Sequence, residues 1–216
     1  MVTISIFDFD GTIANTIPAF ISIFKKLGET YGISIEDETI LKLRDRPIKE
    51  IFHELNIPLI KLPFIARKSR KEFNKEVAHL KPIKGMKNLL LTLKKQGQPL
   101  GIVTSNSKES VKKFLEDNDL QIFDFISTNN RLFGKAKSLK KIFKENELNK
   151  EDAVYIGDEI RDIEAARKMG IKMISVTWGV NSHERLSMYN PDFLVNTPEE
   201  LLALYQNQLV KTTTQK

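Results

Sequence analysis

The chain has 216 residues, a length that suits one large domain or a domain with an insert. Apolar residues make up 41% and charged residues 29%, as is typical of a globular protein, and the formal net charge is +6. It has no cysteine, which excludes a disulfide framework and a thiolate zinc site. The first 20 residues carry two aspartates and do not resemble a signal peptide. No apolar run reaches the ~18 residues of a membrane span. We therefore expect a soluble, cytoplasmic protein without a membrane partner.

The first predicted element is a buried strand over residues 3–7, which ends in Asp8-Phe9-Asp10-Gly11-Thr12. Side chains two apart on a strand point to the same face, so the two carboxylates repel each other. A divalent cation would relieve this repulsion, and an aspartate beside it can attack phosphorus as a nucleophile. Gly11 lets the backbone turn and approach a ligand closely. A plain Asp-Gly turn would explain Asp10 and Gly11 but would leave Asp8 without a role.

The following stretch, residues 17–83, is predicted to be mostly helical. Apolar residues recur there at helical spacing, and we expect helices over 17–27, 37–43, 47–55 and 63–80. Residues 14–84 hold 14 lysines and arginines against 9 aspartates and glutamates, so most of the net positive charge lies here. Such a segment can draw anions toward a site, and solvated helix faces are the alternative. Nucleic-acid binding is not expected, because no interleaved aromatic residues or known module accompany the basic ones.

From Gly85 onward, predicted strands and helices alternate. The strands are expected at 99–103, 123–126, 153–156, 172–176 and 193–195. Helices are expected at 86–95, 107–116 and 135–146, in a stretch that runs through Ile163 to Gly170, and after Thr197. Alternation of this kind predicts βαβ units and a parallel sheet, so the preceding helical stretch is an insert. We therefore expect an α/β core from residues 1–14 and 85–210, a helical insert at 15–84 and a disordered tail at 211–216.

Polar residues fall at three predicted strand ends: Asp8 with Asp10, Thr104, and Asp158. Ligands of open parallel sheets bind beyond the carboxyl ends of the strands, so we expect these residues to converge. Thr104 also precedes a helix, whose free N–H groups and the threonine hydroxyl together suit a phosphate-sized anion. The alternative is that Thr104 or Asn106 only caps this helix, since Asn106 and Glu109 have the spacing of a capping box.

A fourth candidate, Lys135, opens the helix at 135–146. Its ammonium group suits a phosphate and an aspartate together. Lys137 is the rival for this role, because the whole helix is rich in lysine. Asp158 and Asp162 are four residues apart and share a face if the helix has begun there, although helix capping is an alternative. Together with the first two aspartates they form an oxygen-only set, which suits Mg²⁺ rather than zinc.

Over almost the whole chain, these residues resemble the haloacid dehalogenase-like superfamily, most members of which are phosphatases. The four matching motifs are Asp8–Thr12, Gly101–Thr104, Lys135, and Gly157-Asp158 with Asp162, although Ala136 stands where a proline often follows the lysine. Val176–Gly179, Asn190–Asp192 and Glu199–Leu201 are similar to phosphoglycolate-phosphatase-like members. The resemblance implies a Rossmann-like parallel-sheet core with an inserted all-helical cap.

The resemblance also implies a role for each motif residue. Asp8 would attack phosphorus to form an aspartyl-phosphate, and Asp10 would protonate the leaving oxygen and then activate water. Mg²⁺ would be held by Asp8, the backbone carbonyl of Asp10, and Asp158. Asp162 would support the lysine or a metal-bound water. The phosphoryl oxygens would be held by Thr104 and Lys135, with Gly11, Ser105 and Asn106 around them.

The activity implied is an Mg²⁺-dependent phosphatase that hydrolyses a small phosphomonoester, such as a phosphoglycolate-like metabolite. Asp10 argues against the dehalogenase and phosphonate-cleaving branches. A sugar-phosphate mutase would keep the same core motifs, and a binding or regulatory protein could retain the fold without turnover. Arg44 and Arg46 lie in a polar turn between two cap helices, where they could bind the non-reacting end of the substrate or be solvated surface residues. The oligomeric state is left open.

Overall fold

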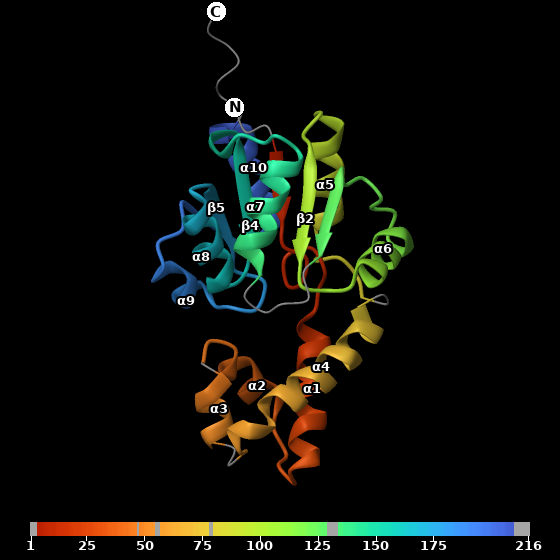
Figure 1. Cartoon of the computed structure of the whole chain (residues 1–216), viewed down its shortest axis with the longest axis vertical. Helices are drawn as coiled ribbons and strands as arrows, with labels where there is room; N and C mark the ends of the chain where they lie inside the picture. Colours follow the sequence, from red (N-terminus) through yellow and green to blue (C-terminus); the bar gives the residue numbers. More distant parts are fainter. Residues whose placement is uncertain (1–3, 47, 55–56, 78–79, 129–133, 210–216) are drawn as a thin grey trace, which may run out of the picture.

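The computed structural model describes residues 4–46, 48–54, 57–77, 80–128 and 134–209. They form a parallel sheet flanked by helices and a separate group of helices beyond one end of that sheet (Figure 1). The predicted tail, 211–216, and the predicted first residue of the helix at 47–55, Pro47, lie outside the described residues. In the described part of the chain, no helix combines the length and the apolarity that a membrane crossing requires.

Within the described residues, the sheet has six parallel strands in the order β3-β2-β1-β4-β5-β6. Their bounds are Ile4–Phe7 for β1, Leu100–Thr104 for β2, Phe125–Thr128 for β3, Ala153–Gly157 for β4, Lys172–Val176 for β5 and Phe193–Val195 for β6. Every residue of β1, β2 and β4 is buried, as expected when helices cover both faces of a parallel sheet. The predicted α/β fold class is confirmed, although β3 begins two residues later than expected.

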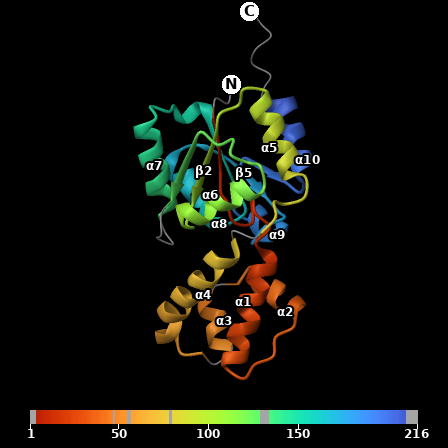
Figure 2. The same ribbon diagram turned by 90° about the vertical axis from the view of Figure 1, so that its right-hand side faces the viewer.

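Helices cover both faces of the sheet, and each face has its own apolar core (Figures 1 and 2). One core takes side chains from α5 (Met86–Lys95), α6 (Lys108–Asp117) and α10 (Pro198–Leu204). The other takes them from α7 (Lys135–Glu145), α8 (Ile160–Met169) and α9 (His183–Ser187). The short helix α9 was not expected from the sequence. It begins at an N-cap, Ser182, whose hydroxyl accepts a hydrogen bond from the backbone N–H of Arg185 at 3.1 Å.

The helical segment contains α1 (Ile17–Thr30), α2 (Asp37–Leu43), α3 (Ile48–Glu54), a 3-10 turn (Leu59–Lys61) and α4 (Leu62–Val77). It has a small core of its own around Phe52, Ile57 and Ile65. The strand arrows point toward this segment, so it lies beyond the carboxyl ends of the strands (Figure 1). The chain enters and leaves it through two connections that run side by side, where Ala14 and Pro82 form an antiparallel bridge.

Candidate active site

The turn after β1 buries one carboxylate fully and the other in part. Asp8 follows the strand directly, is 2% exposed, and its backbone N–H donates to the carbonyl of Ile156 at 2.8 Å. Two residues on, Asp10 is half-buried. Gly11 then turns the chain with a φ of 69°, in the left-handed region that favours glycine. The local sequence therefore places both carboxylates at the carboxyl edge of the central strand.

Lys135, the first residue of α7, lies between two buried carboxylates. Its Nζ is 2.8 Å from Oδ2 of Asp8 and 2.5 Å from Oδ1 of Asp162. Asp162 is held from two further sides, because the hydroxyl of Tyr155 donates to Oδ1 at 3.0 Å and the backbone N–H of Glu159 donates to Oδ2 at 3.0 Å. Asp162 thus caps α8 and also fixes the lysine. The rival residue, Lys137, is exposed.

Asp158 sits in a cradle made by two separate loops. The hydroxyl of Thr12 donates to its Oδ1 at 2.7 Å, and the backbone N–H of Val180 donates to its Oδ2 at 2.6 Å. The cradle is narrow: a Cβ at either Gly11 or Gly179 would lie 2.2 Å from Oδ2. Glycine is therefore required at both positions for the carboxylate of Asp158 to sit where it does.

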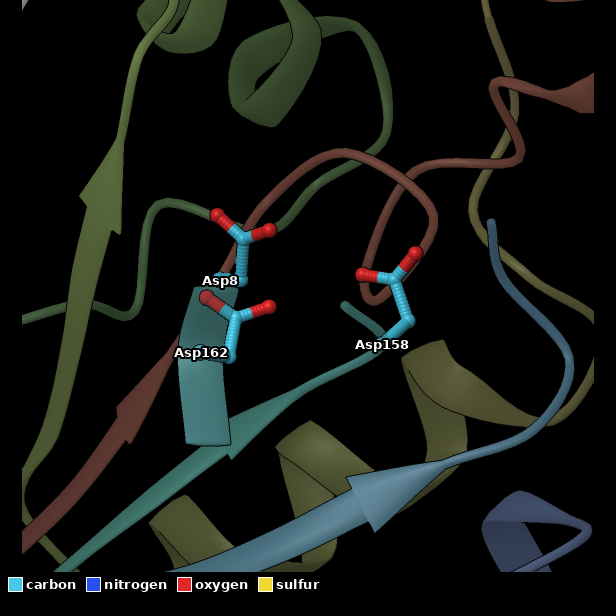
Figure 3. Close-up of side chains that lie close together, drawn as sticks. All are labelled: Asp8, Asp158 and Asp162. Atoms are coloured by element: carbon cyan, nitrogen blue, oxygen red, sulfur yellow. The ribbon is translucent and has the colours of Figure 1, made fainter. Parts of the chain in front are cut away.

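Three of these carboxylates form a group that could hold a metal ion. Asp8, Asp158 and Asp162 each offer an oxygen atom, and the three oxygens lie within 4.8 Å of one another (Figure 3). Burial raises the pKa of Asp8 well above its ordinary value, although Lys135 lowers it, and burial raises the pKa of Asp158 to about 8. A cation would offset this cost of buried charge, and an all-carboxylate set suits a hard ion such as Mg²⁺. Since Asp162 already accepts three hydrogen bonds, Asp8 and Asp158 are the better-placed pair.

The carboxylate of Asp10 is hydrogen-bonded to Asn106. The side-chain amide nitrogen of Asn106 donates to both carboxylate oxygens, at 2.7 and 2.8 Å. Burial raises the pKa of Asp10 to about 7, even though this hydrogen bond lowers it. The alternative that Thr104 or Asn106 caps α6 does not hold, because the N-cap is Ser107, whose hydroxyl accepts a hydrogen bond from the N–H of Ser110 at 3.1 Å. The asparagine is instead used to orient a site carboxylate.

The remaining residues of the expected phosphate site lie beside this pair. Thr104 is the last residue of β2, is 1% exposed, and its Oγ1 accepts from the backbone N–H of Asn106 at 3.0 Å. Ser105 is half-buried between them. Thr104 therefore lies at the carboxyl end of its strand, as the sequence predicts, and the structure shows that this strand pairs with β1.

Several site residues were not identified from the sequence. Tyr155 reads as part of an apolar strand, yet its hydroxyl binds Asp162. The guanidinium of Arg161 binds Glu159 through two nitrogens, at 2.7 and 2.8 Å, and both residues adjoin the candidate centre. Ligands of parallel sheets bind beyond the carboxyl ends of the strands, which is the argument that identified Thr104 from the sequence. The loop at 177–182 follows β5, so the same argument could have identified this loop as part of the site.

The two arginines proposed for substrate recognition lie in the turn between α2 and α3. Arg44 is half-buried, and its backbone oxygen lies 3.3 Å from the side-chain amide nitrogen of Asn181. Arg46 is exposed and pairs with Glu54, while its Nε is 3.8 Å from Oε2 of Glu50. The turn therefore contacts the loop around Asp158, but the guanidinium of Arg46 is engaged within its own segment.

Comparisons with known proteins match this chain along most of its length. The model of the haloacid dehalogenase-like hydrolase family matches residues 5–176. A phosphoglycolate phosphatase from Synechococcus elongatus is 28% identical over 199 residues, covering 91% of this chain and 94% of the relative. Pyrophosphatase PpaX from Bacillus cereus is 27% identical over 210 residues, covering 94% of this chain and 95% of the relative. Among solved structures, a haloacid dehalogenase-like hydrolase from Streptococcus pneumoniae has the same fold, with a TM-score of 0.80 and 23% sequence identity. The match covers 95% of this chain and 99% of that protein.

Proposed function

Because this chain belongs to the haloacid dehalogenase-like hydrolase family, we propose that it is an Mg²⁺-dependent phosphatase that hydrolyses a small phosphomonoester, such as phosphoglycolate. The observation that carries the proposal is the buried carboxylate of Asp8, 2.8 Å from the ammonium group of Lys135. A carboxylate fixed in this way beside a metal site is suited to attack phosphorus. The phosphoglycolate phosphatase and pyrophosphatase relatives support the reaction class.

The metal would be held by Asp8 and Asp158, with the backbone carbonyl of Asp10. The buried oxygen-only donor set and the raised pKa of Asp158 support this choice. When bound, Mg²⁺ supplies positive charge that offsets the charge of the carboxylates and of the phosphoryl group. Asp162 holds Lys135 in place, and Lys135 with Thr104 provides the donors that face the phosphoryl oxygens.

In the first half of the reaction, an oxygen of Asp8 forms a bond to phosphorus and the ester P–O bond breaks. The carboxylic acid of Asp10 gives its proton to the departing alkoxide, so the products are an alcohol, the Asp10 carboxylate and an aspartyl-phosphate. A pKa of about 7 for Asp10 supports this role, because a general acid must be protonated near the working pH.

In the second half, the Asp10 carboxylate takes a proton from water as the water oxygen attacks phosphorus. The acyl-phosphate P–O bond breaks, which releases inorganic phosphate and restores the Asp8 carboxylate and the Asp10 acid. The two hydrogen bonds from Asn106 keep the Asp10 carboxylate aimed in both halves. The ammonium group of Lys135 and the hydroxyl of Thr104 stay bound to the phosphoryl oxygens in both halves. They stabilise their charge without having to move, because the fold already holds them in place.

The test is phosphate release from a panel of phosphorylated metabolites in the presence of Mg²⁺. The panel should include phosphoglycolate, inorganic pyrophosphate, glucose 1-phosphate and p-nitrophenyl phosphate. We expect hydrolysis of at least one small phosphoester, with pyrophosphate as the second candidate because of the pyrophosphatase relatives. Interconversion of glucose phosphates would instead indicate a mutase, and a folded protein without turnover on the whole panel would indicate a binding protein.

A further inference from the structure

The turn between α2 and α3 is hydrogen-bonded to the loop after β5. Oδ1 of Asp45 accepts from the backbone N–H of Ser182 at 2.9 Å and from the side-chain amide of Asn181 at 3.2 Å. The same amide nitrogen lies 3.3 Å from the backbone oxygen of Arg44. Asn181 and Ser182 are 8% and 9% exposed, so water has little access to their polar groups. These contacts join two parts of the chain that are far apart in sequence.

On its other side, Asn181 is hydrogen-bonded to the backbone of two residues beside the candidate metal centre. Its Oδ1 accepts from the backbone N–H of Ile160, the first residue of α8, at 3.0 Å. Its own backbone N–H donates to the carbonyl of Asp158 at 3.2 Å, next to Val180, whose N–H binds the Asp158 carboxylate. A single asparagine therefore connects the helical segment, the start of α8 and the residue that carries a proposed metal ligand.

The carboxylate of Asp45 differs in its partners from the charges around it. Arg46 pairs with Glu54, and Lys42 pairs with Glu38 at 2.9 Å, both within the helical segment. Asp45 instead binds residues of the sheet domain. The two parts are linked covalently by the pair of connections at Ala14 and Pro82, and α4 also packs on α6. Asp45 adds a hydrogen-bonded link at a different place, beside the loop that follows β5.

We propose that Asp45 and Asn181 are positioning residues that dock the helical segment onto the loop holding Asp158. The docked segment then fixes the Val180 N–H against the carboxylate while it covers the carboxyl edge of the sheet. This inference rests on the proposed phosphatase function for its catalytic consequence, but the docking itself does not depend on that function. A charged acceptor makes stronger hydrogen bonds than a neutral one, which suits a contact that must hold two domains together.

The first test measures docking without metal or substrate, from the hydrogen exchange of the Ser182 amide followed by NMR. In Asp45→Ala this amide loses its acceptor, and its exchange should become about 10-fold faster or more. Asp45→Asn keeps an oxygen acceptor and should retain most of the protection. Asp37→Ala, which removes an exposed carboxylate of α2 paired with Lys25, is the matched control and should leave Ser182 unchanged. Amides of β1 should be unaffected in all variants, which verifies that the sheet remains folded.

A variant on the other side of the contact tests the pairing directly. Asn181→Asp keeps an oxygen that can accept from the Ile160 N–H but places a second carboxylate against Asp45. It should speed exchange at Ser182 in the otherwise unchanged protein and should have a smaller effect when Asp45 is already alanine. Equal effects in the two backgrounds, or wild-type exchange in Asp45→Ala, would overturn the proposed docking contact.

The second test is kinetic and uses whichever panel substrate the protein hydrolyses. Asp45→Ala should lower kcat/KM about 10-fold, and Asp45→Asn should recover most of the loss. Faster exchange at Ser182 with unchanged kcat/KM would overturn the positioning role while leaving the contact in place. If the wild-type protein hydrolyses nothing on the panel, the phosphatase proposal fails, and the exchange measurements still decide whether Asp45 docks the segment.

Discussion

Replacing Gly179 with alanine should displace Asp158 without changing any ionisable group. A Cβ at this position would lie 2.2 Å from Oδ2 of Asp158 and 2.3 Å from its Cβ, whereas ordinary van der Waals contact begins at 3.4 Å. Gly179 is not among the residues with a positive φ, so alanine suits its backbone and the clash is the main effect. The carboxylate or the loop must therefore move by about 1 Å.

A displacement of this size is large for a catalytic centre. A misplacement of ~1 Å costs roughly 100-fold in rate, so we expect kcat/KM for Gly179→Ala to fall by about that factor. The Val180 N–H, now 2.6 Å from Oδ2, would lose part of its hydrogen bond in the same movement. Because Asp158 is a proposed metal ligand, the Mg²⁺ concentration needed for half-maximal activity should rise as well.

The assay is phosphate release measured across an Mg²⁺ titration, with thermal unfolding as the check on folding. Thr177→Ala is the matched control, because it lies in the same loop and its hydroxyl donates to Asn196 at 3.1 Å on the exposed side. It should keep near wild-type kinetics. A folded Gly179→Ala protein with wild-type kcat/KM and unchanged Mg²⁺ dependence would refute the reasoning that this cradle positions Asp158 for metal binding.

Three further outcomes are expected. Asp8→Asn should remove turnover while the protein stays folded, because an amide is a poor nucleophile; substantial residual phosphate release from the purified variant would count against a covalent role. Chelation with EDTA should abolish activity and added Mg²⁺ should restore it, because without a cation the buried carboxylates of Asp8 and Asp158 repel each other. Full activity after exhaustive chelation would contradict the metal requirement. If a substrate's second anionic group displaces Glu54 from Arg46, Arg46→Ala should raise KM for that substrate and spare p-nitrophenyl phosphate, which lacks such a group; an equal effect on both, or none on either, would leave Arg46 as a surface partner of Glu54.

The sequence predicted the part of the site that follows from strand periodicity. Asp8, Thr104 and Asp158 each end or follow a buried strand, and the carboxyl ends of parallel strands meet at one edge of the sheet. Their convergence could therefore be inferred before the strand order was known. The strand order itself could not be inferred, because the apolar pattern of a strand does not reveal which other strands lie beside it.

The remaining contacts depend on tertiary structure, for which the sequence has no local signal. Asn106 has the spacing of a capping residue, but the approach of Asp10 offers its amide two charged acceptors, and Ser107 caps the helix instead. Tyr155 has the pattern of a core aromatic residue, and only the packing of α8 on β4 brings Asp162 to its hydroxyl. The contact of Asp45 with Asn181 joins residues 136 positions apart, which no periodicity can indicate.

The central claim, that Asp8 carries the phosphoryl group, is tested most directly with an Asp10→Asn variant and p-nitrophenyl phosphate. The nitrophenolate leaves without needing a proton, so the first step should proceed, whereas the second step lacks its base. We predict a burst of nitrophenolate and a phosphorylated protein, with the phosphoryl group located on Asp8 by mass spectrometry of peptides after acid quenching. A burst without covalent phosphate, or phosphate found on another side chain such as Ser105, would contradict the account.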